Sequence, residues 1–385
     1  MTNIFDYLKW RGDVTFDAYP LNEVDSVIFS QLCYVPFDRI VSEDPNAKGK
    51  TIEDIYDNYF DIVDEKISLG AIIPTDKIMP LFEMLSHSAR FKDVVIRAYV
   101  NEIELSTEKQ FSAMCLDIPD SDITYVVFRG TDDTLVGWKE DFNMSLFTPV
   151  PSQKDGVAYL NRVGNATERR LCLGGHSKGG NIAIYASFMA DEAVQNKIVS
   201  VHNFDGPGFR YEFLNFARQN KKIEKKITNF LPDSSIIGSI FDTIGRRIYV
   251  KSSSKGLFQH DTFSWHLERI NFITVSSLAK SSTQFHNSLE QWISGLSDEE
   301  KRDFVEALFK LIAVNDAGTL SDILSNKFKF IVALFKADDK SKKTVWKTAL
   351  GFLGMKKKKG PKNLTDHDKE ILQKANLLET PESDE

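Results

Sequence analysis

The stretch GGHSKGG, residues 174–180, restricts the fold more than any other part of the chain. It matches G-x-S-x-G, in which a strand turns directly into a helix and carries a serine at the apex. Side chains two residues before and after that serine would collide with the turn or the next strand, so Gly175 and Gly179 fit those places. Apolar residues 171–173 precede the turn. The pattern predicts a nucleophile elbow with Ser177 as nucleophile; the alternative is a glycine-rich turn without chemistry.

The composition excludes several classes of protein. The chain has 385 residues, 42% of them hydrophobic, which suits one large domain with appendages or two domains. Its net charge of -7 opposes broad nucleic-acid binding, which needs a basic face. Cys33, Cys115 and Cys172 are widely spaced, so we expect neither a disulfide framework nor a CxxC metal site, and a reducing compartment fits.

The chain starts MTNIFDYLKWRGDV, without the apolar run of a secretory signal. It also lacks a run of about 18 apolar residues, so no membrane-spanning helix is expected. These features predict a cytoplasmic location.

Apolar spacing predicts helices over 20–37, 51–68 and 78–88. Strands and helices then alternate, which predicts an α/β fold with a mostly parallel sheet covered on both faces. The expected strands lie within 94–105, 111–118, 123–130, 169–175, 198–208, 225–235 and 246–253, with a helix over 184–196.

No internal repeat of fixed period is present. The expected organisation is an N-terminal helical region packed on the core, a core, a C-terminal helical region, and a tail that is first basic and then acidic and partly flexible. Their residues are 1–90, 91–285, 286–336 and 337–385, respectively.

A serine hydroxyl is a weak nucleophile and needs a base and an orienting acid, which in this fold follow it in the order acid, histidine. We prefer His260 as base because it lies in a loop after the strand RRIYV. The alternative for His260 is a surface histidine. Four other histidines follow Ser177 and fit less well. His202 lies in an expected strand and His266 near regular structure, while His286 lies in an expected helix and His367 in the polar tail.

For the acid we prefer Asp233, which follows the strand KKITNF at its carboxyl end, where an open α/β sheet gathers its ligand-binding loops. The alternative acid is Asp205 in NFDGPGF, one strand earlier, which could equally be an Asx-turn residue. Asp261 adjoins His260 and is interpreted as a turn or solvent residue.

Several segments resemble the class 3 lipases of the α/β-hydrolase fold. In those proteins a buried strand ends in F-R-G-[ST], a tryptophan and an aspartate follow, and G-H-S-x-G-G comes next. Here these are the stretch Phe128–Thr131, then Trp138 and Asp141, then 175–180. VHNFDGPGF and ITNFLPDSSIIG resemble later family segments. The whole chain, including PLNEVDSVIFSQLCYVPF, looks most like a bacterial group of lipase-3-like proteins.

The resemblance implies an α/β-hydrolase fold and an oxyanion hole formed by Thr131 and the backbone N–H of Lys178. It also suggests an ion pair of Arg129 with Asp141, here interpreted as structural. Residues 132–142 are either a lid or a plain surface helix. The chain departs from the lipases at Lys178, because lipases commonly carry an apolar residue after the serine.

Residues 341–360 form a second unusual stretch, in which apolar residues lie among seven lysines. Such a basic amphipathic segment can lie peripherally on an anionic membrane surface. The alternative is a terminal helix packed on the domain with a solvated lysine face, which Gly351 and Gly354 would weaken.

Together these features favour a serine hydrolase that cleaves carboxylic esters, with acyl lipids as the favoured substrates, through Ser177, Asp233 and His260. This chemistry needs no metal or cofactor and no nucleic acid. Two alternatives stay open. The chain could be a catalytically inactive hydrolase-fold protein that binds a partner or a membrane, or a thioesterase or peptidase with the same triad.

Overall fold

The computed structural model describes residues 2–63, 75–104, 109–131, 139–140, 143–144, 148–297, 299–303 and 305–306. The chain divides into two compact units, and residues up to Glu290 belong to the first.

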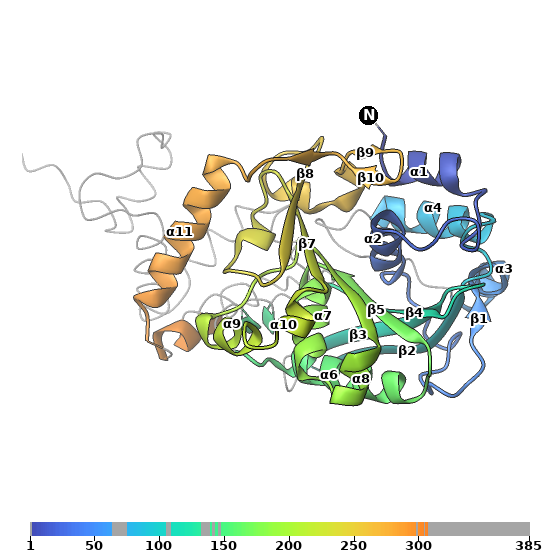
Figure 1. The fold of residues 1–385 in the computed structure, drawn as a ribbon, viewed down its shortest axis with the longest axis horizontal. Coiled ribbons are helices and arrows are strands. Elements are labelled where there is room, and N and C mark those ends of the chain that lie inside the picture. The colour runs from blue at the N-terminus through green and yellow to red at the C-terminus, as the bar shows by residue number, and fades with distance from the viewer. Residues whose placement is uncertain are drawn as a thin grey trace, which may run out of the picture. The chain divides into compact units, whose positions relative to one another are not determined.

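The helices and strands follow one another as Figure 1 labels them. The helices are α1 (Ile4–Arg11), α2 (Glu23–Leu32), α3 (Ile52–Ile62), α4 (Thr75–Ser86), α6 (Pro151–Asn165), α7 (Lys178–Met189), α8 (Glu192–Lys197), α9 (Tyr211–Ala217), α10 (Lys221–Glu224) and α11 (Lys280–Ser294). The strands are β1 (Lys50–Thr51), β2 (Val95–Glu104), β3 (Lys109–Asp117), β4 (Ile123–Phe128), β5 (Arg170–His176), β6 (Ile198–Phe204), β7 (Ile227–Pro232), β8 (Arg246–Val250), β9 (Leu267–Glu268), β10 (Asn271–Phe272) and β11 (Thr274–Val275). Short 3₁₀ turns cover Ile237–Ser239, Gly256–His260 and Thr262–Ser264.

The main sheet has the strand order β1-β2-β3-β4-β5-β6-β7-β8-β11. Strands β4 to β8 are parallel, and β1 to β3 and β11 extend the sheet with antiparallel pairings. Each parallel strand therefore ends at the same edge, and the turns after β5, β6 and β7 lie beside one another. The expected α/β fold is confirmed: this sheet with a serine at the turn from β5 to α7 is the α/β-hydrolase arrangement.

The order of the parallel strands determines how the sheet is covered. Crossovers between parallel strands are right-handed, and strands that follow in sequence order therefore place their crossover helices on one face. Helices α6, α7, α8 and α9 share one apolar cluster on that face with residues such as Val126, Leu173 and Val201. The other face needs another cover.

The N-terminal helices supply that cover. Residues of α1, α2, α3 and α4 share a second apolar cluster with Tyr125, Val127 and Phe204 of the sheet, and Figure 1 shows α2 and α4 on the side opposite α6 and α7. A buried ion pair fixes this N-terminal layer, residues 2–63 and 75–90. Arg90 donates to both carboxylate oxygens of Asp25, at 2.9 and 2.5 Å.

Most elements expected from the sequence are present. The helices around 20–37, 51–68 and 78–88 correspond to α2, α3 and α4, and the expected strands correspond to β2 through β8. The helix expected over 184–196 is in fact the end of α7 followed by α8, with a break at Ala190. Helices α1, α6, α9 and α10 were not expected. The first begins at a capping box in which Asn3 and Asp6 bond each other's backbone N–H groups.

Candidate active site

Ser177 stands at the apex between β5 and α7, with a backbone φ of +56° and ψ of -133°. L-amino acids rarely adopt this conformation, and here it is imposed by the direct passage from strand to helix. The backbone N–H of Ser177 donates to the Phe204 carbonyl at 3.0 Å, which binds the turn to the end of β6. The side chain projects from this fixed turn and is nearly buried, at 9% exposure.

The two glycines of the motif are required by close backbone contact. A Cβ on Gly179 would lie 2.0 Å from the Phe128 carbonyl oxygen, and one on Gly175 would lie 2.3 Å from the Gly179 carbonyl carbon. Strand β4 therefore passes against the start of α7 as the elbow pattern predicts. Any side chain at either position would force the turn away from β4.

His260 ends the 3₁₀ turn Gly256–His260 and is 5% exposed. Its Nδ1 lies 2.7 Å from Oδ2 of Asp205, which directly follows β6. The carboxylate can only accept, so Nδ1 carries the hydrogen and Nε2 keeps its lone pair. This is the tautomer that a general base at Nε2 requires.

Asp205 is itself held firmly. Its other oxygen, Oδ1, accepts from the Ser235 hydroxyl and from the Gly238 N–H at 3.1 Å, and the residue is 1% exposed. The backbone has a φ of +52°, which turns the side chain out of the strand direction. A Cβ on Gly238 would lie 2.4 Å from Asp205 Oδ1, so glycine is needed there for the carboxylate to fit.

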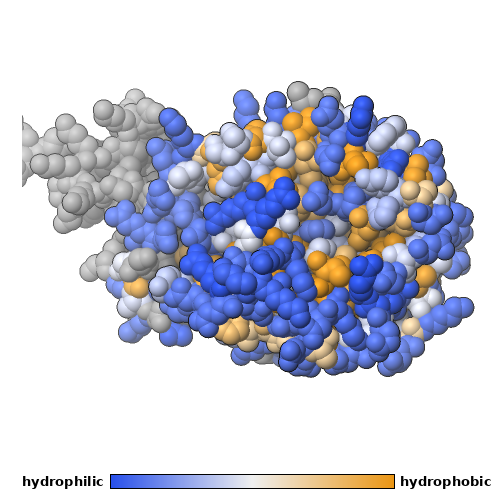
Figure 2. Space-filling view, viewed as in Figure 1, coloured by the Kyte–Doolittle hydropathy of each residue, from blue (hydrophilic) through white to orange (hydrophobic). Residues whose placement is uncertain are grey.

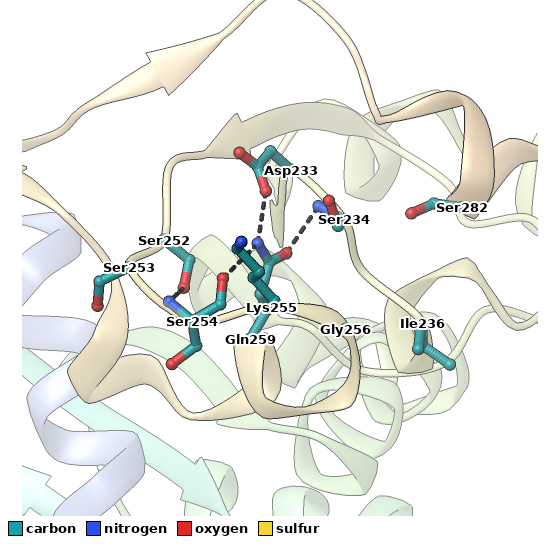
Figure 3. Close-up of a pocket in the computed structure, with 10 residues that line it drawn as sticks. All are labelled: Asp233, Ser234, Ile236, Ser252, Ser253, Ser254, Lys255, Gly256, Gln259 and Ser282. Atoms are coloured by element: carbon teal, nitrogen blue, oxygen red, sulfur yellow. Dashed lines mark hydrogen bonds between the residues drawn. The ribbon is translucent and has the colours of Figure 1, made fainter.

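The structure does not bring Asp233, the preferred acid, to His260. Asp233 Oδ1 accepts from Gln259 Nε2 at 2.6 Å, and Gln259 also accepts from the Ser234 N–H (Figure 3). Asp233 lines a cavity of about 560 Å³ together with five serines and Lys255. The preferred partner of His260 is therefore corrected from Asp233 to Asp205, the alternative acid. Asp233 bonds the neighbouring Gln259 of the Gly256–His260 turn, and the His260 ring faces Asp205.

His176, immediately before Ser177, connects the elbow to the 3₁₀ turn Gly256–His260. Its Nε2 lies 2.8 Å from the backbone carbonyl of His260, and the two imidazole rings lie 4.3 Å apart at 35°. Burial and the neighbouring His260 hold the pKa of His176 well below its usual value. Among the described residues, no hydrogen bond joins Ser177 Oγ to His260, and such bonds commonly tighten only when substrate binds.

The oxyanion residues implied by the family resemblance lie close to the elbow. Gly130 and Thr131 lie two and three residues after the end of β4, and a Cβ on Gly130 would lie 3.0 Å from the Ser177 Cβ. Thr131 is 5% exposed. Lys178 is the first residue of α7, so its backbone N–H belongs to the helix N-terminus beside Ser177. Two sources of N–H groups thus lie near the serine.

The Lys178 side chain points away from that N-terminus into a buried polar cluster. Its Nζ donates to Glu140 Oε2 at 3.0 Å, to the Gln110 carbonyl at 2.8 Å and to Gln110 Oε1 at 3.2 Å. Glu140 also accepts from the N–H groups of Gln110 and Ser152. Lys178 and Glu140 are each 1% exposed, so this is a buried and well-satisfied ion pair.

Several expected features fall outside the described residues. These are Trp138 and Asp141, most of the possible lid at 132–142, and His367. The stretch 341–360, with its expected membrane contact, also lies outside them. Of the expected Arg129–Asp141 pair, only Arg129 is described, and it donates to Asn101 Oδ1 at 3.0 Å. Membrane contact and cytoplasmic location stay predictions.

Within the described residues, no group of three His, Cys, Asp or Glu side chains is placed to hold a metal ion. No helix there is long and apolar enough to cross a membrane. Hydrophilic side chains predominate on the face shown in Figure 2, with apolar residues in small groups between them. The large exposed apolar side chains include Phe258, 71% exposed, two residues before His260.

A sequence model of one family matches residues 85–310, more than half of the chain. That family is described as Mbeg1-like. The chain belongs to the Mbeg1-like family. The matched region contains the elbow, Asp205 and His260, whereas most of the N-terminal layer precedes it. The match supports the resemblance to lipase-like α/β-hydrolases; membership of a bacterial group stays a prediction.

Solved lipase structures show a more distant likeness to this Mbeg1-like chain. Two Rhizomucor miehei lipase–propeptide complexes match at 14% and 13% identity, with TM-scores of 0.33 and 0.32. They cover 45% and 56% of this chain, and it covers 58% and 78% of them; the first is therefore matched over less than two thirds of its length. A mutant form of MDLA from Penicillium cyclopium matches at 11% identity and TM-score 0.36, over 67% of this chain and 87% of its own. None of the curated proteins matches.

Three residues that contact His176 or Lys178 of the elbow were not predicted from the sequence. Tyr34, from the segment after α2, bonds His176, while Gln110 and Glu140 surround Lys178. For Glu140 a signal was available: a lysine beside the nucleophile needs a buried acid if it does not reach solvent. Tyr34 gave no such signal.

Proposed function

We propose that this Mbeg1-like protein is a serine hydrolase that cleaves carboxylic esters, with acyl lipids as the favoured substrates. Ser177 is the nucleophile, His260 the base and Asp205 the orienting acid. The single observation that carries the proposal is the 2.7 Å bond from His260 Nδ1 to Asp205, next to a serine held at φ +56° on a strand–helix turn.

Each residue has a defined step. Ser177 Oγ attacks the ester carbonyl carbon while His260 Nε2 takes the serine proton. The C–O bond to the leaving alcohol then breaks, and His260 returns the proton to that oxygen. Water, with His260 again as base, cleaves the acyl–serine ester and regenerates the enzyme. Asp205 keeps Nδ1 protonated and stabilises the imidazolium formed in each half of the reaction.

The N–H groups of Thr131 and Lys178 are the proposed donors to the oxyanion of each tetrahedral intermediate. Donors fixed in a helix N-terminus and a strand end need no rearrangement when negative charge develops, which is why such sites stabilise the transition state.

Fluorophosphonate labelling tests the proposal directly, because the probe reacts only with an activated serine. We expect labelling of the wild type and its loss in Ser177→Ala and His260→Ala. Ser187→Ala is the matched control: Ser187 lies on the same helix, is buried, and donates only to the Ile184 carbonyl at 2.7 Å. Folded wild type that is not labelled would contradict the proposal and favour an inactive hydrolase-fold binding protein.

Nitrophenyl esters of increasing acyl-chain length then test the substrate class. Rising kcat/KM with chain length supports acyl lipids, whereas preference for acetyl esters contradicts them. Matched thioester and peptide substrates separate the thioesterase and peptidase alternatives, which share the triad and differ in the leaving group.

A further inference from the structure

A chain of two hydrogen bonds runs from the N-terminal layer to the proposed catalytic base. The Tyr34 hydroxyl lies 3.1 Å from His176 Nδ1, and His176 Nε2 lies 2.8 Å from the backbone carbonyl oxygen of His260. Tyr34 is fully buried, and His176 is 2% exposed. These three residues lie 142 and 84 positions apart in the sequence, so only the fold brings them together.

The direction of both bonds follows from the acceptor at one end. A carbonyl oxygen cannot donate, so the hydrogen on His176 is at Nε2. Nδ1 of the neutral ring then has a lone pair, and the Tyr34 hydroxyl must donate to it. Because burial and the adjacent His260 hold the pKa of His176 well below its usual value, the ring stays neutral and the direction is kept at neutral pH.

This chain fixes the part of His260 that Asp205 does not reach. Asp205 holds the side chain at Nδ1, His176 holds the backbone carbonyl, and the His176 ring lies against the His260 ring at 4.3 Å. Only Nε2 of His260 is left for the serine proton. A displacement of about 1 Å in such a group can reduce the rate about 100-fold.

The Tyr34 hydroxyl also lies against the strand end that carries Thr131. A Cβ on Gly130 would lie 2.2 Å from that hydroxyl and 2.6 Å from the His176 carbonyl oxygen. Tyr34 therefore contacts both sides of the elbow, at Gly130 and at His176, while it belongs to the N-terminal layer. A phenylalanine there would fill the same space without donating.

We propose that Tyr34 is a positioning residue for His260, acting through His176, so that the N-terminal layer completes the active site. This inference rests on the proposed function, because it concerns the base of that reaction. Tyr34 precedes the region that the family model matches. The N-terminal layer would therefore support catalysis as well as cover the sheet.

The test is Tyr34→Phe in the full chain, with Tyr59→Phe as the matched control. Tyr59 is a buried tyrosine of the same layer whose hydroxyl donates to the Pro36 carbonyl at 3.1 Å rather than to a residue of the elbow. Rates are measured well below the melting temperature and expressed per fluorophosphonate-reactive site. For Tyr34→Phe we expect kcat and the labelling rate to fall about tenfold or more, with KM within about twofold. Tyr59→Phe should match the wild type.

A second pair of variants separates positioning from core packing. Because Tyr34 acts through His176, Tyr34→Phe should change kcat less than about twofold in a His176→Leu background. Should His176→Leu not fold, the His260 Nδ1–H resonance in Tyr34→Phe replaces this measurement. That resonance is assigned by its loss in Asp205→Asn, and we expect it to broaden or shift in Tyr34→Phe and stay unchanged in Tyr59→Phe.

Several results would overturn the inference. These are an unchanged kcat in Tyr34→Phe, an equal loss in Tyr59→Phe, a change confined to KM, full additivity with His176→Leu, or an unchanged Nδ1–H resonance where that measurement is used. Each is distinct from failure of the proposed function, which shows as absent labelling of the wild type.

Discussion

Asp205 and Asp233 follow neighbouring parallel strands, and at the scale of single residues they differ in their contacts. Asp205 is 1% exposed and bonds His260, Ser235 and Gly238. Asp233 bonds Gln259 and borders a cavity of about 560 Å³. A carboxylate that must stabilise a transient imidazolium benefits from low exposure, because water screens the interaction less there.

Asparagine at each position separates the two acids. In Asp205→Asn the amide favours the wrong His260 tautomer, and we expect kcat to fall about 10³–10⁴-fold, as in triads that lose their acid. Asp233→Asn keeps an acceptor for Gln259 and should change kcat less than about threefold. Ester hydrolysis, normalised by folded protein, measures both. A large loss in Asp233→Asn with a small one in Asp205→Asn would reverse the assignment.

The sequence favoured Asp233 as the partner of His260, whereas in the structure His260 bonds Asp205, the alternative acid. The elbow has a recognisable sequence pattern because close backbone contacts, which any such turn must make, require glycine at two positions. The acid has none: both aspartates stand at the ends of parallel strands, where either could reach the histidine. What distinguishes them is the left-handed backbone of Asp205 and the path of the Gly256–His260 turn, and neither shows in residue types.

At the scale of elements, Lys178 joins four parts of the fold. Its partners lie at the start of β3 and in the connection between β4 and α6, while Glu140 also accepts from the N–H of Ser152 at the start of α6. The ion pair thus joins the segment between β4 and α6, which contains Thr131, to the first turn of α7. A buried pair contributes little net stability, yet removing one partner leaves a buried charge.

Lys178→Met should therefore destabilise the protein by about 3–5 kcal/mol. Lys178→Met/Glu140→Leu removes both charges and should recover most of that loss. Urea unfolding of the wild type, both single variants and the double variant gives the coupling free energy. Additive losses would mean that the two side chains do not depend on each other.

His202 links β6 to α2, with Nδ1 3.0 Å from the Ser26 hydroxyl. Burial lowers its pKa from 6.5 to about 4. In the unfolded chain His202 binds a proton below about pH 6.5, whereas in the folded chain it binds one only near pH 4. The free energy of unfolding therefore falls as the pH drops through this range. The loss from this residue reaches about 2 kcal/mol at pH 5.

Urea unfolding between pH 7.5 and 5 measures this dependence. The glutamine in His202→Gln cannot titrate, so the free energy of unfolding of this variant should decline less steeply with falling pH than that of the wild type. Near pH 5 the two slopes should differ by the amount that corresponds to about one bound proton. Parallel curves for the two proteins would show that His202 carries no part of the acid sensitivity. His176, whose pKa is lowered in the same direction, contributes to the slope that remains.

For the whole molecule, the sequence predicted the alternation of strands and helices and a sheet covered on both faces. It did not predict which elements cover each face, because that follows from the strand order. Strands β4 to β8 follow one another across the sheet, so right-handed crossovers leave one face to the N-terminal helices. Strand order depends on pairings between distant segments, which local apolar spacing does not record.

A chain that begins at Phe91 tests whether the sheet needs the N-terminal layer to cover its second face. It lacks the N-terminal layer, including β1, but keeps strands β2 to β8 and the helices that connect the parallel strands. It would expose buried sheet residues such as Tyr125, Val127 and Phe204. It would also lose Arg90 and Asp25. An apolar sheet face of this size drives aggregation. We expect the fragment to be insoluble or to unfold without a cooperative transition in urea. Cooperative unfolding of a soluble fragment, with its Ser177 still reactive, would contradict this, because both the sheet cover and the Tyr34 bond would then be dispensable.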